Sequence, residues 1–348
     1  MGVVAGAALY VYANQRVNQK AVACSACTPA PAGASGTNLL VMASDTRQGL
    51  SPSEAKLLDP GNVDLNDGTR ADSIALVHLE PSSGKAVVIS IPRDLRVPAP
   101  GGGYEKINAY FNDGPVPLVA EVSSLTGLPI QHFVEVNFVS FGEITQALGG
   151  VDVYFNRAID DPNSGLNEPQ GCDLLTGGQA LAFVRDRDTD SDFGRIARQR
   201  LFVTLMMNKV LTPGTLLNPV KVVNLVKLGL GALTHDSGLG LTTMLDLALH
   251  FHSFSSSDID FRVLPVQSTG QVIGGVDYVI ENSSQAAALL TAVRDGTALP
   301  PYGVQSVNPA PTPASGGSAP PASPAAPAAS PPAGAPATTP GASFGAPC

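Results

Sequence analysis

Hydrophobic positions along this chain alternate between short apolar runs and longer stretches with helical spacing. Short Val/Ile/Leu runs are typical of strands, whereas apolar residues at every third and fourth position are typical of amphipathic helices. The runs predict strands over 38–43, 73–79, 86–91, 132–136, 151–155 and 259–264. The helical spacing predicts helices over 116–125, 138–148, 178–183, 193–211, 219–233, 242–251 and 284–294. This alternation predicts an α/β fold, an α-β-α layered domain with a mixed central sheet.

The two ends of the chain differ from the middle. Residues 2–13 are apolar but fall short of the roughly 20 residues that a membrane-spanning helix needs, so we interpret residues 1–20 as a partial N-terminal membrane anchor. A short buried helix is the alternative. Residues 21–36 are predicted to be a linker, and residues 37–298 the folded domain. Residues 299–348 are rich in Pro, Ala and Ser and carry no charge, which predicts a disordered C-terminal tail.

The helix predicted over 193–211 has a polar face that leads into an apolar one. Its apolar stripe consists of Val203, Met206, Met207 and Val210. Its first turns place three polar side chains three and four residues apart, namely Arg195, Arg198 and Gln199. Such a surface fits a ligand with a charged head and an apolar tail.

Polar clusters lie at the ends of the first three predicted strands. They are Ser44-Asp45-Thr46-Arg47, Arg70-Ala71-Asp72-Ser73 and Pro92-Arg93-Asp94. Ligands of α/β sheets bind in loops beyond strand ends, so we expect one shared site. Carboxylates beside several arginines suit a metal–diphosphate complex, because Mg²⁺ takes carboxylate and phosphate oxygens while Arg forks hold the remaining oxygens. The structural alternative is a turn cap at Asp45 and a surface pair of Arg93 with Asp94.

Charge, motif content and cysteine spacing exclude several classes of function. The net charge of −9 argues against nucleic acid as a partner. The sequence lacks a GxxxxGK[ST] loop and a G-x-S-x-G elbow, which argues against a P-loop site and a serine hydrolase. The spacing of the four cysteines, Cys24, Cys27, Cys172 and Cys348, does not suit structural zinc. Three disulfide connectivities and unpaired thiols all stay open.

In their order along the chain and in their amino-acid sequence, these motifs resemble those of the LytR-CpsA-Psr family. The matching segments are NLLVMASDTR (38–47), TRADSIALVHL (69–79), VVISIPRDLRV (87–97), EKINAYF (105–111), ALGGVDV (147–153), LTGGQALAFVRDR (175–187) and FGRIARQR (193–200). The resemblance is specific over 38–211 and weaker through 295. Ala43 stands where the family usually has glycine, and Gln199-Arg200 stands where it commonly has two glutamines. Neither departure removes an acid or an arginine.

The resemblance implies an extracytoplasmic catalytic domain on a single-pass anchor in the cell membrane. It implies a Mg²⁺-dependent phosphotransferase that moves a glycopolymer from a polyprenyl-diphosphate carrier to peptidoglycan. The composition and the segment ALAFVRDRD resemble actinobacterial members, which makes arabinogalactan a candidate polymer. A polyprenyl-diphosphate hydrolase and a non-catalytic binder of lipid-linked glycans, or envelope regulator, are the alternatives.

Site residues are carried over by motif position. The aspartates matching the family's Mg²⁺ site are Asp45 and Asp72. The residues expected to act in catalysis are Arg70, Arg93, Asp94, Arg185 and Arg195. The residues expected to bind the diphosphate are Arg70, Arg93, Arg185, Arg187, Arg195, Arg198, Gln199 and Asn108.

A prenyl chain also needs an elongated apolar cavity. The residues predicted to line it are Val119, Val139, Phe141, Val203, Met206, Met207 and Leu225. The alternative is that these side chains form a close-packed core.

Overall fold

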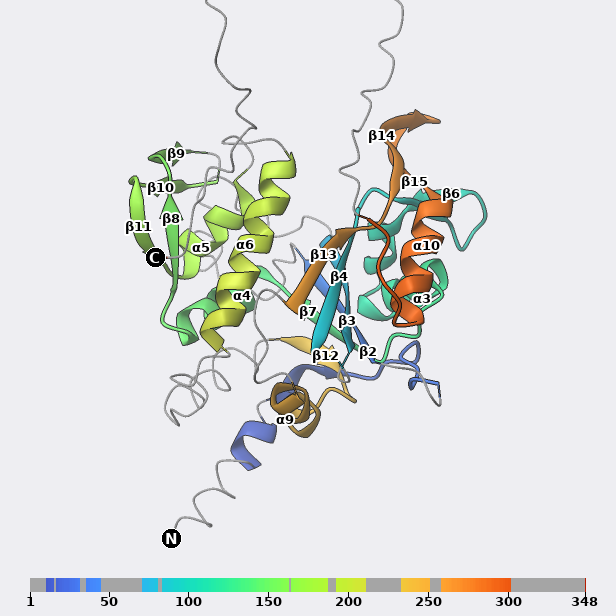
Figure 1. The fold of residues 1–348 in the computed structure, drawn as a ribbon, viewed down its shortest axis with the longest axis horizontal. Helices are drawn as coiled ribbons and strands as arrows, with labels where there is room; N and C mark the ends of the chain where they lie inside the picture. Colours follow the sequence, from blue (N-terminus) through green and yellow to red (C-terminus); the bar gives the residue numbers. More distant parts are fainter. Residues whose placement is uncertain are drawn as a thin grey trace, which may run out of the picture.

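A seven-stranded mixed sheet forms the centre of the fold (Figure 1). The computed structural model describes residues 11–15, 17–31, 36–44, 71–80, 83–162, 164–186, 192–210, 233–250, 258–301 and 348. The strands in spatial order are β1 (Ala21–Val22), β12 (Thr234–Asp236), β7 (His132–Val136), β2 (Thr37–Ser44), β3 (Ala71–Glu80), β4 (Lys85–Ile91) and β13 (Ile259–Val263). β2 runs parallel to β7 and β4 runs parallel to β13, whereas β3 is antiparallel to both of its neighbours. The predicted mixed sheet is confirmed.

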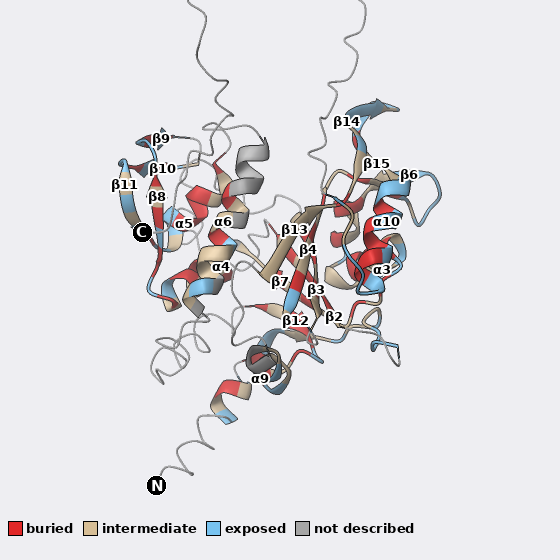
Figure 2. Ribbon diagram, viewed as in Figure 1, coloured by how far each residue is buried: buried red, intermediate tan, exposed pale blue. Residues whose placement is uncertain are grey.

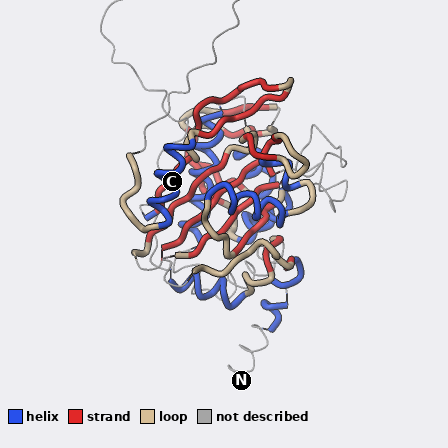
Figure 3. Tube along the Cα trace, turned by 90° about the vertical axis from the view of Figure 1, so that its right-hand side faces the viewer, coloured by secondary structure: helices blue, strands red, loops and turns tan. Residues whose placement is uncertain are grey.

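Helices lie on both sides of this sheet (Figure 1), and Figure 3 is viewed from the side of α3 and α10. One face packs against α3 (Pro115–Thr126) and α10 (Ser283–Arg294). On the other side lie α4 (Phe138–Ala147), α5 (Gly177–Arg185) and α6 (Asp192–Val210). This is the predicted α-β-α layering.

The helix ends follow local sequence signals. Prolines begin α3, where a missing N–H costs nothing, and Gly127 ends it in the left-handed conformation at φ 65°. The side chain of Asn137 caps α4 by accepting a hydrogen bond from the backbone N–H of Ser140 at 2.9 Å. Together with α9 (Leu241–His250), these helices confirm six of the predicted segments. The helix predicted over 219–233 lies almost wholly outside the described residues.

The main core lies between the sheet and the helices α3 and α10, as the buried residues in Figure 2 show. Burial alternates along β2: Leu40 and Met42 are fully buried, while Leu39 and Val41 are half-buried. Continuous apolar runs such as 39–42 are typical of strands covered on both faces. In β2, however, only the side chains facing α3 and α10 are fully buried.

A second core joins α4, α5 and α6 to small antiparallel ribbons. These pair β8 (Val151–Phe155) with β11 (Gly171–Leu175), and β9 (Ile159–Asp161) with β10 (Leu166–Glu168). Phe155 and Phe183 meet edge to face with ring centroids 5.7 Å apart. The predicted strand at 151–155 therefore exists, but it lies outside the central sheet.

Two further ribbons extend from the strand ends near α10. One consists of β5 (Arg96–Pro98) and β6 (Tyr104–Lys106), followed by the 3₁₀ helix η2 (Ile107–Phe111). The other consists of β14 (Val266–Ile273) and β15 (Val276–Glu281). These strands are too short or too polar to stand out in the hydrophobic pattern, and the sequence did not predict them.

The N-terminal segment packs against the domain ahead of the 3₁₀ helix η1 (Asn18–Lys20). Ala13 and Val17 are buried with Leu241, and the carbonyl oxygen of Val17 lies 2.7 Å from Nε2 of His235. Within the described part of the chain, no helix is long and apolar enough to cross a membrane. Residues 1–10 of the predicted anchor, and residues 302–347 of the predicted tail, lie outside that part.

Candidate functional site

Three of the predicted polar residues meet at the ends of β3 and β4. Arg93 follows β4 and donates from Nη1 to the carboxylate of Asp72 in β3. Its Nε lies 3.5 Å from Oδ2 of Asp94, and Nζ of Lys106 lies 2.8 Å from Oδ1 of that same carboxylate. We call Asp72, Arg93, Asp94 and Lys106 the strand-end cluster. Lys106 lies in a matched motif, yet sequence reasoning did not select it.

The strand-end cluster is charged and open to solvent. About a third of each side chain is exposed, from 31% for Lys106 to 37% for Asp72. Burial opposes the charge of Arg93, but attraction to Asp72 and then to Asp94 outweighs it and raises the pKa of Arg93. Asn108, another predicted residue, is buried, and its backbone N–H donates to the carbonyl of Arg93 at 3.2 Å. The cluster thus presents a fixed cation flanked by carboxylates.

The two remaining strand-end residues of the prediction, Asp45 and Arg70, lie outside the described residues. Their chain neighbours Ser44 and Ala71 pair across β2 and β3. In the protein interior, the Ser44 hydroxyl donates to Oε1 of Glu135 at 2.8 Å. Burial raises the pKa of Glu135, although the hydrogen bond from Ser44 opposes the shift. Sequence reasoning missed Glu135; a lone glutamate in the apolar strand 132–136 was the available signal.

A second group of predicted residues lies where α5 meets α6. Arg185 is the last residue of α5 and is half-buried. Arg198 on α6 is fully buried, with Nη1 3.7 Å from Oδ2 of Asp186 and Nη2 donating to the Asp186 carbonyl. Nε2 of Gln199 donates to the carbonyl of Val184 at 3.3 Å. Arg198 and Gln199, which we call the α5–α6 clamp, therefore hold the chain on both sides of Arg185.

This arrangement changes the interpretation of Arg198. A guanidinium with no exposed surface that binds Asp186 holds the fold in place, and the structure does not place it as a ligand of the diphosphate. Arg195 belongs to the first turns of α6, but its side chain is not described, and Arg187 lies outside the described residues.

Among the described residues, no side chain predicted to line the apolar cavity is placed beside one. Val119 belongs to the main core under α3, on the opposite side of the sheet from α6, so its assignment to a cavity beside Arg195 is wrong. Phe141 and Met206 pack against the second core, and Val203 is 46% exposed. The side chains of Val139, Met207 and Leu225 are not described.

The sheet itself offers another apolar surface. On the face turned away from the main core, neighbouring strands carry a row of half-buried apolar side chains. The register of the strands places these residues side by side: Leu39, Val77, Val88 and Phe261.

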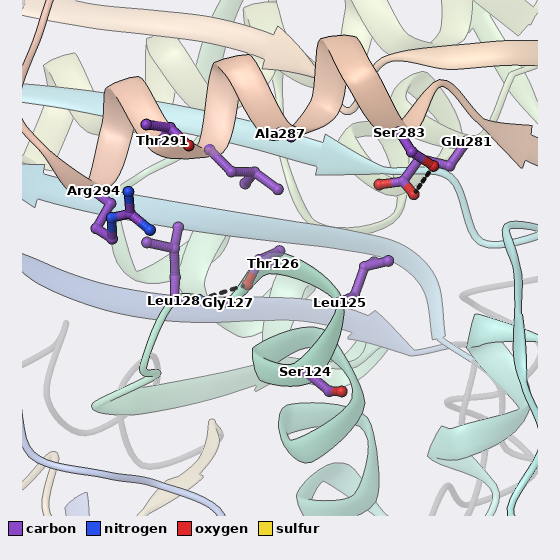
Figure 4. A pocket seen from close by; sticks show the side chains of 11 residues that line it. Ser124, Leu125, Thr126, Gly127, Leu128, Glu281, Ser283, Ala287, Thr291 and Arg294 are labelled. Carbon is purple, nitrogen blue, oxygen red and sulfur yellow. Dashed lines mark hydrogen bonds between the residues drawn. The ribbon is translucent and has the colours of Figure 1, made fainter.

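A pocket of about 370 Å³ opens between the end of α3 and α10 (Figure 4). Its lining includes Thr126, Glu281 and Arg294, and the Ser283 hydroxyl donates to Glu281 at 3.1 Å beside it. None of the predicted site residues lines this pocket. Within the described ranges, no group of three or more His, Cys, Asp or Glu side chains could hold a metal ion by itself.

Relatives of this chain act in cell-wall assembly. The chain is 34% identical over 271 residues to the probable cell wall biosynthesis protein LcpB of Corynebacterium glutamicum, covering 77% of this chain. The chain spans 64% of that relative's length, less than two thirds. It is 30% identical over 234 residues to a polyisoprenyl-teichoic acid–peptidoglycan teichoic acid transferase TagU of Oceanobacillus iheyensis, covering 64% of this chain and 70% of TagU.

A solved structure shows the same architecture. The LytR-Csp2A-Psr enzyme from Actinomyces oris superposes with a TM-score of 0.57 at 25% identity, covering 79% of this chain and 95% of that one. The model of the LytR_cpsA_psr family matches residues 7–295, which spans both the strand-end cluster and the α5–α6 clamp. This chain belongs to the LytR_cpsA_psr family.

Proposed function

We propose that this protein is a Mg²⁺-dependent phosphotransferase that moves a glycopolymer, as a glycosyl phosphate, from a polyprenyl-diphosphate carrier to peptidoglycan. The observation that carries the proposal is the strand-end cluster, because Arg93 and Lys106 offer donors for phosphate oxygens at an exposed edge. Similarity to the teichoic acid transferase TagU supports the reaction class.

The chemistry is a displacement at phosphorus. The acceptor hydroxyl oxygen forms a bond to the glycan-linked phosphorus, and the bond from that phosphorus to the bridging oxygen breaks. Polyprenyl phosphate leaves with the bridging oxygen, and the hydroxyl proton is released to solvent. Arg93 suits this step because a guanidinium fork binds two oxygens at once and stabilises charge that accumulates there.

Asp72 and Asp45 are the residues proposed to hold Mg²⁺. Asp72 fits, since its carboxylate is 37% exposed at the strand end and offers the hard oxygen ligands that Mg²⁺ prefers. Mg²⁺ commonly binds one or two carboxylates and completes its shell with phosphate oxygens and water, so a larger protein cage is not required. When bound, the ion would offset the negative charge of the diphosphate.

The prenyl chain of the carrier is proposed to lie on the half-buried apolar face of the sheet. Leu39, Val77 and Val88 form part of this face, which is turned toward the side of α4–α6. Burying apolar surface at about 25 cal/mol per Å² would favour binding of a long chain there.

The location proposed is outside the cytoplasm, on a single-pass N-terminal anchor. Support comes from the disulfides, which pair Cys24 with Cys27 and Cys172 with Cys348. Structural disulfides persist in oxidising compartments and are rare in the cytosol. This pairing is one of the three disulfide connectivities that the spacing of the cysteines left open.

The test uses a polyprenyl-diphosphate glycan labelled at the glycan-linked phosphorus, together with peptidoglycan and Mg²⁺. The proposal predicts that the label becomes attached to peptidoglycan and that polyprenyl phosphate is released. Label released as soluble glycosyl phosphate would favour the hydrolase, and an intact bound donor would favour the binder or regulator. Either of these results would contradict the proposal.

A further inference from the structure

The ribbon formed by β5 and β6 carries an exposed aromatic ring that is fixed in place. Tyr104 is 54% exposed, yet the guanidinium carbon of Arg96 lies 3.4 Å from the centre of its ring. The hydroxyl of Tyr278 donates to the Tyr104 carbonyl at 3.3 Å, which ties the ribbon to β15. Both the ring and the backbone beneath it are therefore held from neighbouring strands.

The Arg96 side chain stacks on this ring. Its Nε is buried and has no hydrogen-bond partner in the described part of the chain, while its guanidinium also lies 5.9 Å from the Tyr278 ring. A single exposed aromatic residue is ordinary on a protein surface. A ring already stacked on a cation loses less conformational freedom on binding, so it is better prepared for a ligand.

The ring lies next to the strand-end cluster. Tyr104 and Lys106 are two residues apart in β6, so their side chains share one side of the ribbon at a spacing of about 7 Å. Lys106 in turn contacts Asp94 at 2.8 Å. The adjoining turn consists of Gly101, Gly102 and Gly103, and a Cβ placed on any of them would meet nothing within 4 Å. The space around this turn, next to Tyr104 in the chain, is therefore open.

We propose that Tyr104, backed by Arg96, is a platform on which a sugar ring of the acceptor glycan stacks. This inference rests on the proposed function, in which an acceptor hydroxyl must approach the diphosphate beside Arg93. The C–H groups on one face of a pyranose carry slight positive charge and match the negative face of an aromatic ring. Lys106 supplies donors for the surrounding hydroxyls. A protein partner would need a contact of roughly 800 Å² on each side, much more than one ring provides.

The experiment measures co-sedimentation of the full chain with purified peptidoglycan sacculi, before and after protease treatment of the sacculi. The variants are Tyr104→Ala, Tyr104→Phe, and Leu174→Ala as the matched control, since Leu174 is 44% exposed on β11. We expect Tyr104→Ala to raise the dissociation constant about fivefold or more, in line with the loss of one stacking contact. Tyr104→Phe keeps the ring and should bind within about twofold of the parent, as should Leu174→Ala. Circular dichroism would verify that each variant is folded.

Unchanged binding by Tyr104→Ala would overturn the platform, and so would a Tyr104→Phe variant as weak as Tyr104→Ala. Binding by the parent that disappears after protease treatment would identify a protein partner and would also overturn it. Donor cleavage without an acceptor and transfer at varied acceptor concentration are measured on the same proteins. If the parent neither cleaves nor transfers the donor, the proposed function fails. If the parent and Tyr104→Ala transfer with the same acceptor KM, only the platform fails.

Discussion

Replacing Arg198 by methionine tests whether this motif arginine holds the fold or binds substrate. The guanidinium and the Asp186 carboxylate are both fully buried, so Arg198→Met removes the cation and leaves the acid in the interior. Breaking a buried pair in this way costs about 3–5 kcal/mol. For a domain of this size each kcal/mol corresponds to a shift of roughly 2–4 °C, so we expect Tm to fall by about 10 °C.

The assay is thermal unfolding followed by circular dichroism, with a second variant as control. Asp186→Asn combined with Arg198→Met removes both charges of the pair, and it should recover a large part of the lost Tm because the Asp186 charge no longer stays buried without Arg198. Arg93 provides the contrast, since its side chain is 34% exposed and its ion pairs are worth about 1 kcal/mol or less. An Arg198→Met variant that melts within about 2 °C of the parent would refute this assignment.

The other residues give three more expectations. Arg93→Lys should lower the transfer rate because the bidentate fork is lost, and Arg93→Ala should lower it further. Arg157 is exposed and lies outside every matched motif, so Arg157→Ala should transfer at nearly the parent's rate. Equal losses at Arg93 and Arg157 would show that the site is misplaced. Asp72→Asn and Asp45→Asn should each lower both activity and its Mg²⁺ dependence, and full activity of both variants in chelator would contradict a metal role. Glu135→Gln should stabilise the protein at a pH of about 8. Folding raises the pKa of Glu135 above its ordinary value of 4.5, so the ionised Glu135 lowers the free energy of unfolding once the pH rises above that value. Melting curves should show this gain shrinking toward a pH of about 4, and a gain independent of pH would show that the ionisation of Glu135 has no part in it.

Periodicity predicted the strands and helices of the layered domain well, because long apolar runs leave few alternatives. The 132–136 and 151–155 strands were predicted to the residue, but periodicity could not show that the second pairs outside the main sheet. Val119 shows what the hydrophobic pattern cannot predict, because the same apolar spacing suits a packed core and a cavity that holds a lipid chain. Which face a helix buries depends on long-range packing.

At the candidate site, the motif order identified residues that the fold brings together, as Arg93 and Asp72 show. It could not separate arginines that face solvent from one that is buried against a neighbouring acid, as Arg198 is. That distinction depends on the side-chain partner, Asp186, which lies 12 residues earlier in the chain. Arg93 is paired with Asp72 and Asp94, so its removal should not raise stability.

The most direct test of the transferase function follows the labelled phosphorus of a polyprenyl-diphosphate glycan in the presence of peptidoglycan and Mg²⁺, with the parent and Arg93→Ala compared side by side. We expect label on peptidoglycan and free polyprenyl phosphate for the parent, and a large loss of both for a still folded Arg93→Ala. Label that never reaches peptidoglycan with the parent, or that reaches it equally well with Arg93→Ala, would contradict the central claim.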